Sequence, residues 1–396
     1  MSQIFELFGY PLADQSQEAR ESRHNAWCPF MGKECDGGGN RPQSALSLKK
    51  NDDLREFFRD RSAVQAGVCS LQLNPGARPW IVCPRRLLAL RRDNGNSSYQ
   101  RELELALLNT LDYPSGTRLG VWSEVGLKFV TNNGKVTVEV DVEAPPEVVD
   151  EDEENSDDLE GIEASGKSFD YRFDYIIMPI GRMALDDVIR QLGLTIRQVM
   201  SIANKAGYRL VTDHTGSYID DFPCGHPYVI EIMTSSTSGG NKRKRTTIPM
   251  AFEDAVLGKP HIGPGINYRQ VWARMVSQLI VKSEVAMGWG GKTIWVVQDA
   301  LVDYISKSTA LDVRKFASEH LSEVNMLSFS YRNNYQNPGG LIDLTDTELF
   351  AGPIGQQDGK AGETFLDILR TPVQPELDRL VLALAQKKFV NTLVVP

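Results

Sequence analysis

Beyond residue 120 the chain carries short apolar runs, several alternating with polar residues, each bounded by Gly or Pro. Three such runs lie at 136–142 (VTVEVDV), 173–180 (FDYIIMPI) and 228–234 (YVIEIMT). Alternation with a period of two places successive side chains on opposite faces of a strand, and short apolar runs fit more deeply buried strands. The three segments are therefore predicted to be strands.

Between the last two of these runs, residues 184–207 (ALDDVIRQLGLTIRQVMSIANKAG) predict two short helices that are broken near Gly193. The pair superficially resembles a helix-turn-helix. Without a stronger signature, the favoured interpretation is that both helices pack on the sheet.

A longer helical pattern follows. Segment 266–287 repeats apolar residues at three- and four-residue spacing, at Trp272, Met275, Val276, Leu279 and Ile280. This spacing predicts an amphipathic helix. A strand, a helix, a further strand and a C-terminal helix are predicted at 292–298, 299–308, 325–332 and around 376–389. Because these elements interleave without regular βαβ repeats, the predicted fold class is α/β (α+β), a mixed central sheet flanked by helices.

The first hundred or so residues are rich in Arg, Gly, Pro and Cys and show little periodicity. Such a segment suits a small unit organised by a bound metal rather than by a large core. We therefore expect an N-terminal domain over 1–110 and a second domain over 111–396.

The formal net charge of −9 argues at first against a nucleic-acid partner. However, residues 143–163 hold eleven acidic residues and no Lys or Arg; without them 43 basic residues face 41 acidic ones. This composition predicts a flexible acidic insertion at about 143–168. With no long apolar run and no secretory signal at the start, we expect a cytoplasmic, bacterial protein without a membrane partner.

Five cysteines in a reducing compartment do not suggest a disulfide framework. Cys28 and Cys35 are separated by six residues, and Cys69 and Cys83 by thirteen. Four thiolates complete a closed structural shell for zinc or iron, although these spacings differ from the common CxxC pairs. Four independent buried thiols remain the alternative. Cys224 has no partner in sequence and is interpreted as a small apolar filler.

Two predicted strands each carry an acid among apolar residues, Asp174 in RFDYII and Glu231 in VIEIMT. An unpaired charge there is costly unless something compensates it. Acids on adjacent strands can hold Mg²⁺ for phosphodiester hydrolysis, and the carbonyl of Ile232 offers another oxygen. A solvent-facing or salt-bridged acid is the alternative at each position.

In the nuclease pattern PD…(D/E)xK, a lysine two residues beyond the second acid positions the attacking water. Met233 occupies that position and cannot do so. Another base or a second metal ion must substitute, and Lys242 and Lys244 are nearby candidates. They belong to a basic run, Lys242, Arg243, Lys244 and Arg245. The run is either a solvated loop or a phosphate clamp that contacts DNA.

Several of these segments together resemble a known family. The order WCPF, a second Cys, GVC, WIVCPRRLL, FDY, VIEIMT and GPGINYRQVWARMVSQLIVKSEVAMG is similar to the NotI-like type II restriction endonucleases. The similarity is patchy and runs from about residue 27 to 305. Its most specific parts are the four cysteines in their flanking contexts and the segment that begins GPGI, continues as a helix and is followed by a strand.

The resemblance implies a PD-(D/E)xK restriction-endonuclease fold, a homodimer on palindromic double-stranded DNA and Mg²⁺-dependent cleavage. It implies that Cys28, Cys35, Cys69 and Cys83 hold a structural iron, with zinc as the alternative. It implies that Asp174 and Glu231 are the catalytic Mg²⁺ ligands and that Glu124, in VWSEVGLKF, is an additional upstream carboxylate. Two features depart from the family: Met233, where the family has Gln, and the acidic insertion with the extra helices before Glu231.

The expected function is thus a type II restriction endonuclease that leaves 5′-phosphate and 3′-hydroxyl ends. A non-cleaving, sequence-specific DNA-binding protein on the same fold is a rival, motivated by Met233. A DNA repair or mobile-element nuclease is a second rival, which would cut according to DNA structure.

Overall fold

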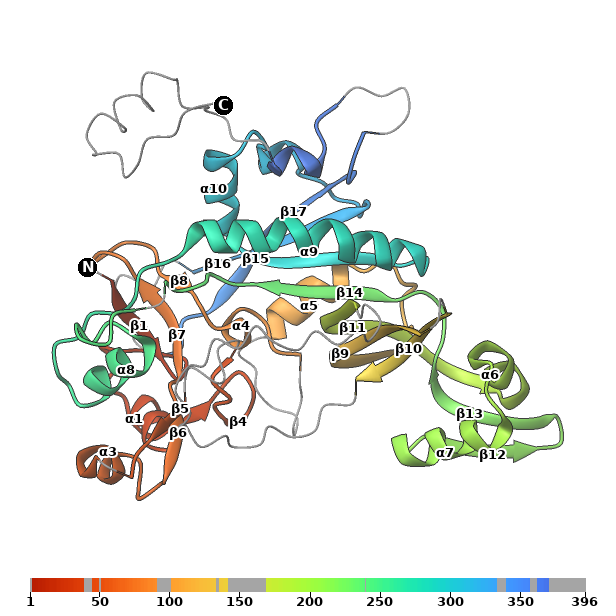
Figure 1. Ribbon diagram of the computed structural model, residues 1–396, viewed down its shortest axis with the longest axis horizontal. Coiled ribbons are helices and arrows are strands. Elements are labelled where there is room, and N and C mark those ends of the chain that lie inside the picture. Colours follow the sequence, from red (N-terminus) through yellow and green to blue (C-terminus); the bar gives the residue numbers. More distant parts are fainter. Residues whose placement is uncertain are drawn as a thin grey trace, which may run out of the picture.

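A mixed β-sheet runs through the centre of the computed structural model, which describes residues 2–38, 45–49, 51–90, 101–132, 135–141, 169–238, 240–332, 340–356 and 362–369 (Figure 1). Within these residues the main path of the sheet has the order β10–β9–β11–β14–β15–β16–β17. The strands are β9 (Leu119–Asn132), β10 (Lys135–Asp141), β11 (Phe169–Ala184), β14 (Tyr228–Met233), β15 (Lys292–Gln298), β16 (Val324–Tyr331) and β17 (Leu344–Gly352).

Strands β9, β11 and β14 are antiparallel neighbours, and β15 and β16 continue the sheet in parallel. Helix α9 (Tyr268–Gly288) makes the crossover from β14 to β15. A parallel connection needs such a crossover element, whereas antiparallel neighbours do not. Every residue of β14 is buried, which suits a strand covered on both faces.

Two apolar clusters cover the two faces of the sheet. On one face α9 packs Met275 and Leu279 against Trp295, in a cluster that also includes α10 (Asp299–Ser308), η3 (Val313–Phe316) and η5 (Phe365–Leu369). On the other face α4 (Pro84–Leu87) and α5 (Arg101–Thr110) pack against residues such as Ile230 and Ile294. The middle strands are therefore shielded from solvent on both sides.

The N-terminal part forms its own sheet, β2–β1–β7–β8, at one end of the molecule (Figure 1). Its strands are β1 (Gln3–Leu7), β2 (Tyr10–Pro11), β7 (Val68–Gln72) and β8 (Trp80–Ile81). The small ladders β3 (Trp27–Cys28) with β4 (Lys33–Glu34) and β5 (Ala45–Ser47) with β6 (Ala63–Gln65) lie beside helices α1 (Gln17–His24) and α3 (Asp52–Phe57).

This N-terminal unit also has an apolar core. Phe8, Phe58 and Phe252 pack together, and Phe252 comes from α8 (Ile248–Val256), far along the chain. The sequence of the first hundred residues does not indicate this core because one of its helices follows β14. Conversely, α5 falls within the predicted N-terminal domain (1–110) yet packs on the central sheet.

At the opposite end, residues 185–223 form a lobe that we call the distal lobe (Figure 1). It consists of α6 (Leu185–Leu192), α7 (Ile196–Ala206), β12 (Arg209–Asp213) and β13 (Gly216–Pro223). Strand β13 pairs with both β12 and the end of β11. The two helices thus pack on this hairpin and the last part of β11.

The large mixed sheet flanked by helices confirms the predicted α/β class. Each strand and helix predicted within the described residues is present, with small shifts at the ends. The acidic insertion at 143–168 and the helix around 376–389 lie outside the described residues, and the division at residue 110 stays a prediction. No helix among the described residues is both long and apolar enough to cross a membrane.

Candidate functional site

Three acids lie close to one another on neighbouring antiparallel strands: Glu124 on β9, Asp174 on β11 and Glu231 on β14. In the β11–β14 ladder Tyr175 pairs with Ile230, so Asp174 lies one step further along, beside Glu231. In the β9–β11 ladder the pairs on either side of Asp174 flank Glu124. The structure therefore brings the three sequence-predicted acids together.

Glu231 is buried, with 3% of its surface exposed. Its Oε2 accepts a hydrogen bond of 2.6 Å from Nζ of Lys282, while its Oε1 has no partner among the described residues. The ammonium of Lys282 also lies 5.6 Å from the centre of the Phe173 ring. A buried carboxylate oxygen without a hydrogen bond is costly, so this atom is suited to receive a cation or a donor.

The pKa shifts of the two buried acids, Asp174 and Glu231, also indicate a site that favours a positive charge. Burial raises the pKa of Asp174, although its carboxylate accepts a 2.7 Å hydrogen bond from the amide of Ile232. Burial, and then the nearby negative charge of Asp174, raise the pKa of Glu231 to about 8. Two desolvated carboxylates that repel each other favour a bound positive charge. Carboxylate oxygens are the ligands that a hard divalent cation such as Mg²⁺ prefers, although no three His, Cys, Asp or Glu residues in the described ranges are arranged so that they could hold a metal ion.

Glu124 completes the cluster in a strained backbone. Its φ of 54° lies in the left-handed region, which costs a non-glycine residue about 1–3 kcal/mol. Its Oε1 accepts a 3.0 Å hydrogen bond from Nη2 of Arg85. Arg85 also reaches the hydroxyl of Tyr175 and the carboxylate of Asp36. The arginine therefore holds Glu124 toward the site while connecting it to the N-terminal unit.

Lys282 was not found by sequence reasoning, which looked only near Met233. Met233 is buried in the cluster beneath α9, and the lysine that contacts Glu231 comes from α9 itself. A signal was present in the sequence: Lys282 continues the apolar stripe of Met275 and Leu279 and precedes Ala286, all of them buried. A charged residue in an apolar helical stripe indicates a buried partner.

The basic run after β14 lies in an exposed turn. Arg245 donates hydrogen bonds to Glu253 and Asp254 of α8, which commits its guanidinium to the protein. Lys242, Arg243 and Lys244 are exposed. The structure therefore places Lys282, rather than Lys242 or Lys244, at Glu231, and the DNA-clamp interpretation of the run stays a prediction.

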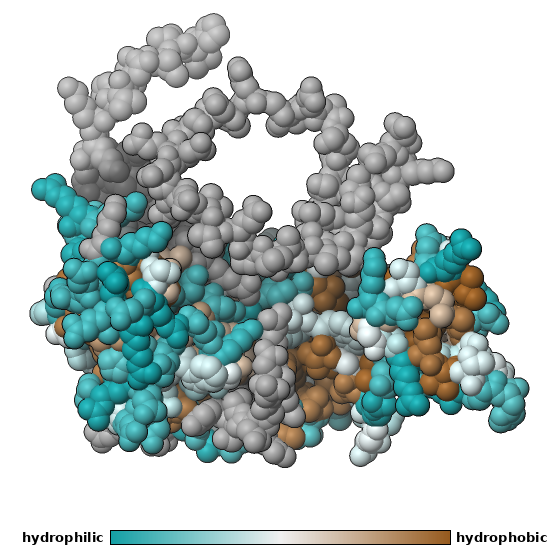
Figure 2. All heavy atoms as spheres, turned by 90° about the horizontal axis from the view of Figure 1, so that it is seen from below, coloured by the Kyte–Doolittle hydropathy of each residue, from teal (hydrophilic) through white to brown (hydrophobic). Residues whose placement is uncertain are grey.

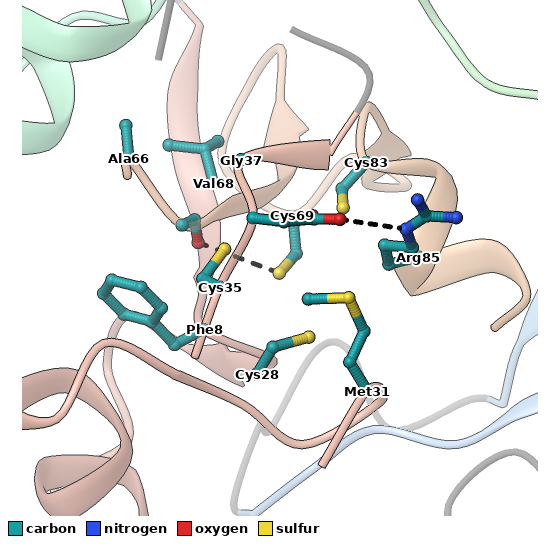
Figure 3. A pocket seen from close by; sticks show the side chains of 12 residues that line it. Phe8, Cys28, Met31, Cys35, Gly37, Ala66, Val68, Cys69, Cys83 and Arg85 are labelled. Carbon is teal, nitrogen blue, oxygen red and sulfur yellow. Dashed lines mark hydrogen bonds and ion pairs between the residues drawn. The ribbon is translucent and has the colours of Figure 1, made fainter. Parts of the chain in front are cut away.

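The four candidate cysteines line one pocket, with their sulfur atoms directed into the same space (Figure 3). Cys28 ends β3 and Cys35 follows β4, so this pair spans one tight antiparallel turn. Cys69 on β7 and Cys83 after β8 span a second hairpin, in which the amide of Cys83 donates to the carbonyl of Cys69. The unusual spacings are therefore the lengths of two hairpins.

Backbone amides surround these sulfurs. The amides of Phe30 and Met31 donate to Cys28, and that of Gly9 donates to Cys69 at 3.3 Å. Burial nevertheless raises the pKa of each of the four, and that of Cys28 is about 12. Neighbouring cysteines raise the pKa further at Cys28, Cys35 and Cys69, and Asp36 does so at Cys83. Such a group of buried thiols has the donor chemistry for a soft or borderline metal, which stabilises thiolates.

As the side chains stand, however, no group of three or more His, Cys, Asp or Glu residues in the described ranges is arranged so that it could hold a metal ion. The structural iron thus stays a prediction. Cys224 is half-buried near Gly181 and is not one of the pocket residues.

Comparisons of the chain with known protein families, curated proteins and solved structures found no match.

Proposed function

We propose that this chain is a Mg²⁺-dependent endonuclease that hydrolyses phosphodiester bonds in double-stranded DNA, of the type II restriction kind. The observation that carries the proposal is the buried Glu231, flanked by Asp174 on the adjacent strand and by Lys282, with one carboxylate oxygen unpartnered. The cysteine contexts that resemble the NotI-like enzymes support the same class.

Each residue of the site has a task in this reaction. Asp174 and Glu231 bind the catalytic ion, and a bound Mg²⁺ supplies a water of lowered pKa and offsets charge on the phosphate. The amide of Ile232 orients Asp174, and Arg85 orients Glu124. Glu124 is suited to hold a water or a second ligand position at the edge of the cluster.

Lys282 takes the part that the lysine of the PD-(D/E)xK pattern plays. Its ammonium is held by Glu231 and lies over the ring of Phe173. An ammonium has three N–H donors, so those that do not contact Glu231 can orient the attacking water or contact a phosphate oxygen. Because this placement supplies the missing ammonium, it weakens the motive for the non-cleaving rival, which rested on Met233.

The four pocket cysteines fit a structural metal, iron by resemblance and zinc as the alternative. This pocket and the carboxylate cluster share Arg85, which lines the first and contacts Glu124 in the second. An ordered N-terminal unit therefore has a direct effect on the position of Glu124. The homodimer on palindromic DNA remains part of the proposal by resemblance alone.

Digestion of a plasmid of known sequence tests the proposal. The parent chain should produce discrete fragments with Mg²⁺, while Asp174→Ala should produce none and still bind the DNA. Asp52→Ala, which changes an exposed aspartate of α3 with 96% of its side chain exposed, is the matched control and should cut like the parent. The proposal fails if the parent makes no discrete fragments with Mg²⁺ or Mn²⁺, or if Asp174→Ala cuts as well as the parent.

A further inference from the structure

The distal lobe takes no part in the carboxylate site, yet it is a well-formed unit. Its core consists of Leu185, Val188, Val199, Ala203, Ile219 and Phe222, a cluster separate from those of the central sheet. The lobe stands at the end of the molecule opposite the N-terminal unit, with hydrophobic and hydrophilic residues mixed on its surface (Figures 1 and 2). Because the lobe has its own core, it is a separate structural unit to which a separate function can be assigned.

Its two helices are joined by a short turn, as in a helix-turn-helix. Gly193 ends α6 with φ of 63°, and only Leu194 and Thr195 separate it from α7. Thr195 and Gln198 form a capping box that fixes the start of α7. A three-residue turn with glycine between two helices is typical of this motif. The antiparallel hairpin β12–β13 follows directly and packs on the same core.

Helix α7 is buried on one side only. Val199 and Ala203 are 1% exposed, whereas Arg197, Ser201 and Lys205 are all exposed on the outer side. Two exposed isoleucines, Ile196 (55%) and Ile202 (44%), lie on the two flanks of the helix. The helix thus presents a whole face that the lobe does not cover.

The chemistry of this face suits duplex DNA. Helix α7 carries Arg197 and Lys205 and no acidic residue. Arginine donates two hydrogen bonds to a guanine edge, and an apolar side chain contacts the thymine methyl group. The acids elsewhere in the lobe are largely held in ion pairs, as Asp187 with Arg190, Asp213 and Asp220 with Arg182, and Asp221 with Arg118. They therefore repel a phosphate backbone less than the lobe's composition suggests.

We propose that the distal lobe reads DNA sequence, with the N-terminal half of α7 in the major groove. Arg197 and Ile196 contact base edges, Lys205 contacts phosphate, and the β12–β13 hairpin lies against the adjacent backbone. The inference rests on the proposed function for duplex DNA as the ligand. The lobe follows β11, on which Asp174 and Ala184 are ten residues apart. At about 3.3 Å per residue this spans at most about 33 Å, close to one turn of B-DNA.

The test is binding of the full-length chain to duplexes selected from a random-sequence pool, without a divalent ion. The parent should select a consensus. Arg197→Ala should bind the selected duplex about 10- to 100-fold more weakly and lose the preference at one base pair on reselection. Lys205→Ala should weaken binding to all duplexes alike and reduce the slope of log K against log salt by about one. Arg20→Ala, an exposed arginine on α1, is the matched control and should bind like the parent.

Parent-like binding by Arg197→Ala and Lys205→Ala, with unchanged circular dichroism, overturns the inference. Loss of dimer mass in Ile196→Ser with DNA affinity retained also overturns it, because the face then joins two chains. If the parent binds no duplex, both proposals fail. Cleavage that is insensitive to both α7 substitutions removes only the inference. Binding that depends on Arg197, with no cutting under any divalent ion, removes only the proposed nuclease activity.

Discussion

Nζ of Lys282 lies 2.6 Å from Oε2 of Glu231, and the two residues come from α9 and from a strand 51 positions earlier. Both side chains are nearly inaccessible to solvent: 11% of the Lys282 side chain and 4% of the Glu231 side chain are exposed. The contact places an ammonium where the neighbouring sequence offers only Met233. It is the relationship on which the proposed chemistry most depends.

Replacing this ammonium should remove most of the catalysis. Lys282→Met is expected to cut DNA about 100- to 1000-fold more slowly, because a fixed donor to the developing charge is lost. DNA affinity, measured separately without a divalent ion, should change little. Lys244→Met is the comparison and should lower the rate by less than about tenfold. Parent-like cutting by Lys282→Met contradicts the assignment.

The same pair makes a prediction about stability. Lys282→Met leaves a carboxylate buried without its partner and should lower the free energy of unfolding by about 3 kcal/mol in urea titrations. The double variant Glu231→Gln with Lys282→Met has no unpaired buried charge and should recover most of that loss. Additive losses in the double variant would show that the two residues do not interact in the folded protein.

The cysteine pocket predicts that the protein contains a bound structural metal ion. Elemental analysis of the parent should find about one iron per chain, with zinc as the alternative, and chelation should lower the melting temperature. Cys69→Ala should lose the metal and unfold at a lower temperature. Cys224→Ala, outside the pocket, is the matched control and should keep the metal. A parent protein that contains no metal, and whose melting temperature does not change on chelation, would instead support four independent thiols.

A second buried ion pair joins the N-terminal unit to the central sheet. Arg86 contacts Glu6 at 3.0 Å, and Glu6 also accepts hydrogen bonds from Ser70 and from Tyr331 on β16. Since Glu6 is fully buried, Arg86→Met should cost about 3–5 kcal/mol of unfolding free energy. Urea denaturation measures this. Arg55→Met, which removes an exposed pairing partner of Asp52, should cost no more than about 1 kcal/mol.

His261 predicts a pH dependence of stability. Its Nε2 accepts a hydrogen bond from the amide of Ile4, and burial lowers its pKa below 6.5. Between that lowered pKa and 6.5 the unfolded chain binds more protons than the folded one, so stability falls as the pH drops through this window. His261→Gln should flatten that part of a plot of unfolding free energy against pH. The same change at exposed His320 is the control, and an unchanged slope in His261→Gln would contradict the prediction.

The local sequence pattern was sufficient to predict the strands and helices and some of the site residues. Segments 173–180, 228–234 and 266–287 fold as predicted because alternation and helical stripes reflect which face each element buries. The acids Asp174 and Glu231 were recognisable because a charge in an apolar strand needs compensation. The four cysteines were recognisable as a set by their number and context.

Only the tertiary structure decided which distant residues complete each cluster. Lys282 reaches Glu231 because the α9 crossover lays that helix over β14, and Arg85 reaches Glu124 because α4 packs beneath the sheet. The sequence predicts two helices over residues 184–207, but the separate core of the distal lobe and the uncovered α7 face appear only once β13 pairs with β11. Contacts between segments far apart depend on how the elements pack, and that information is spread over the whole chain rather than held in any local window.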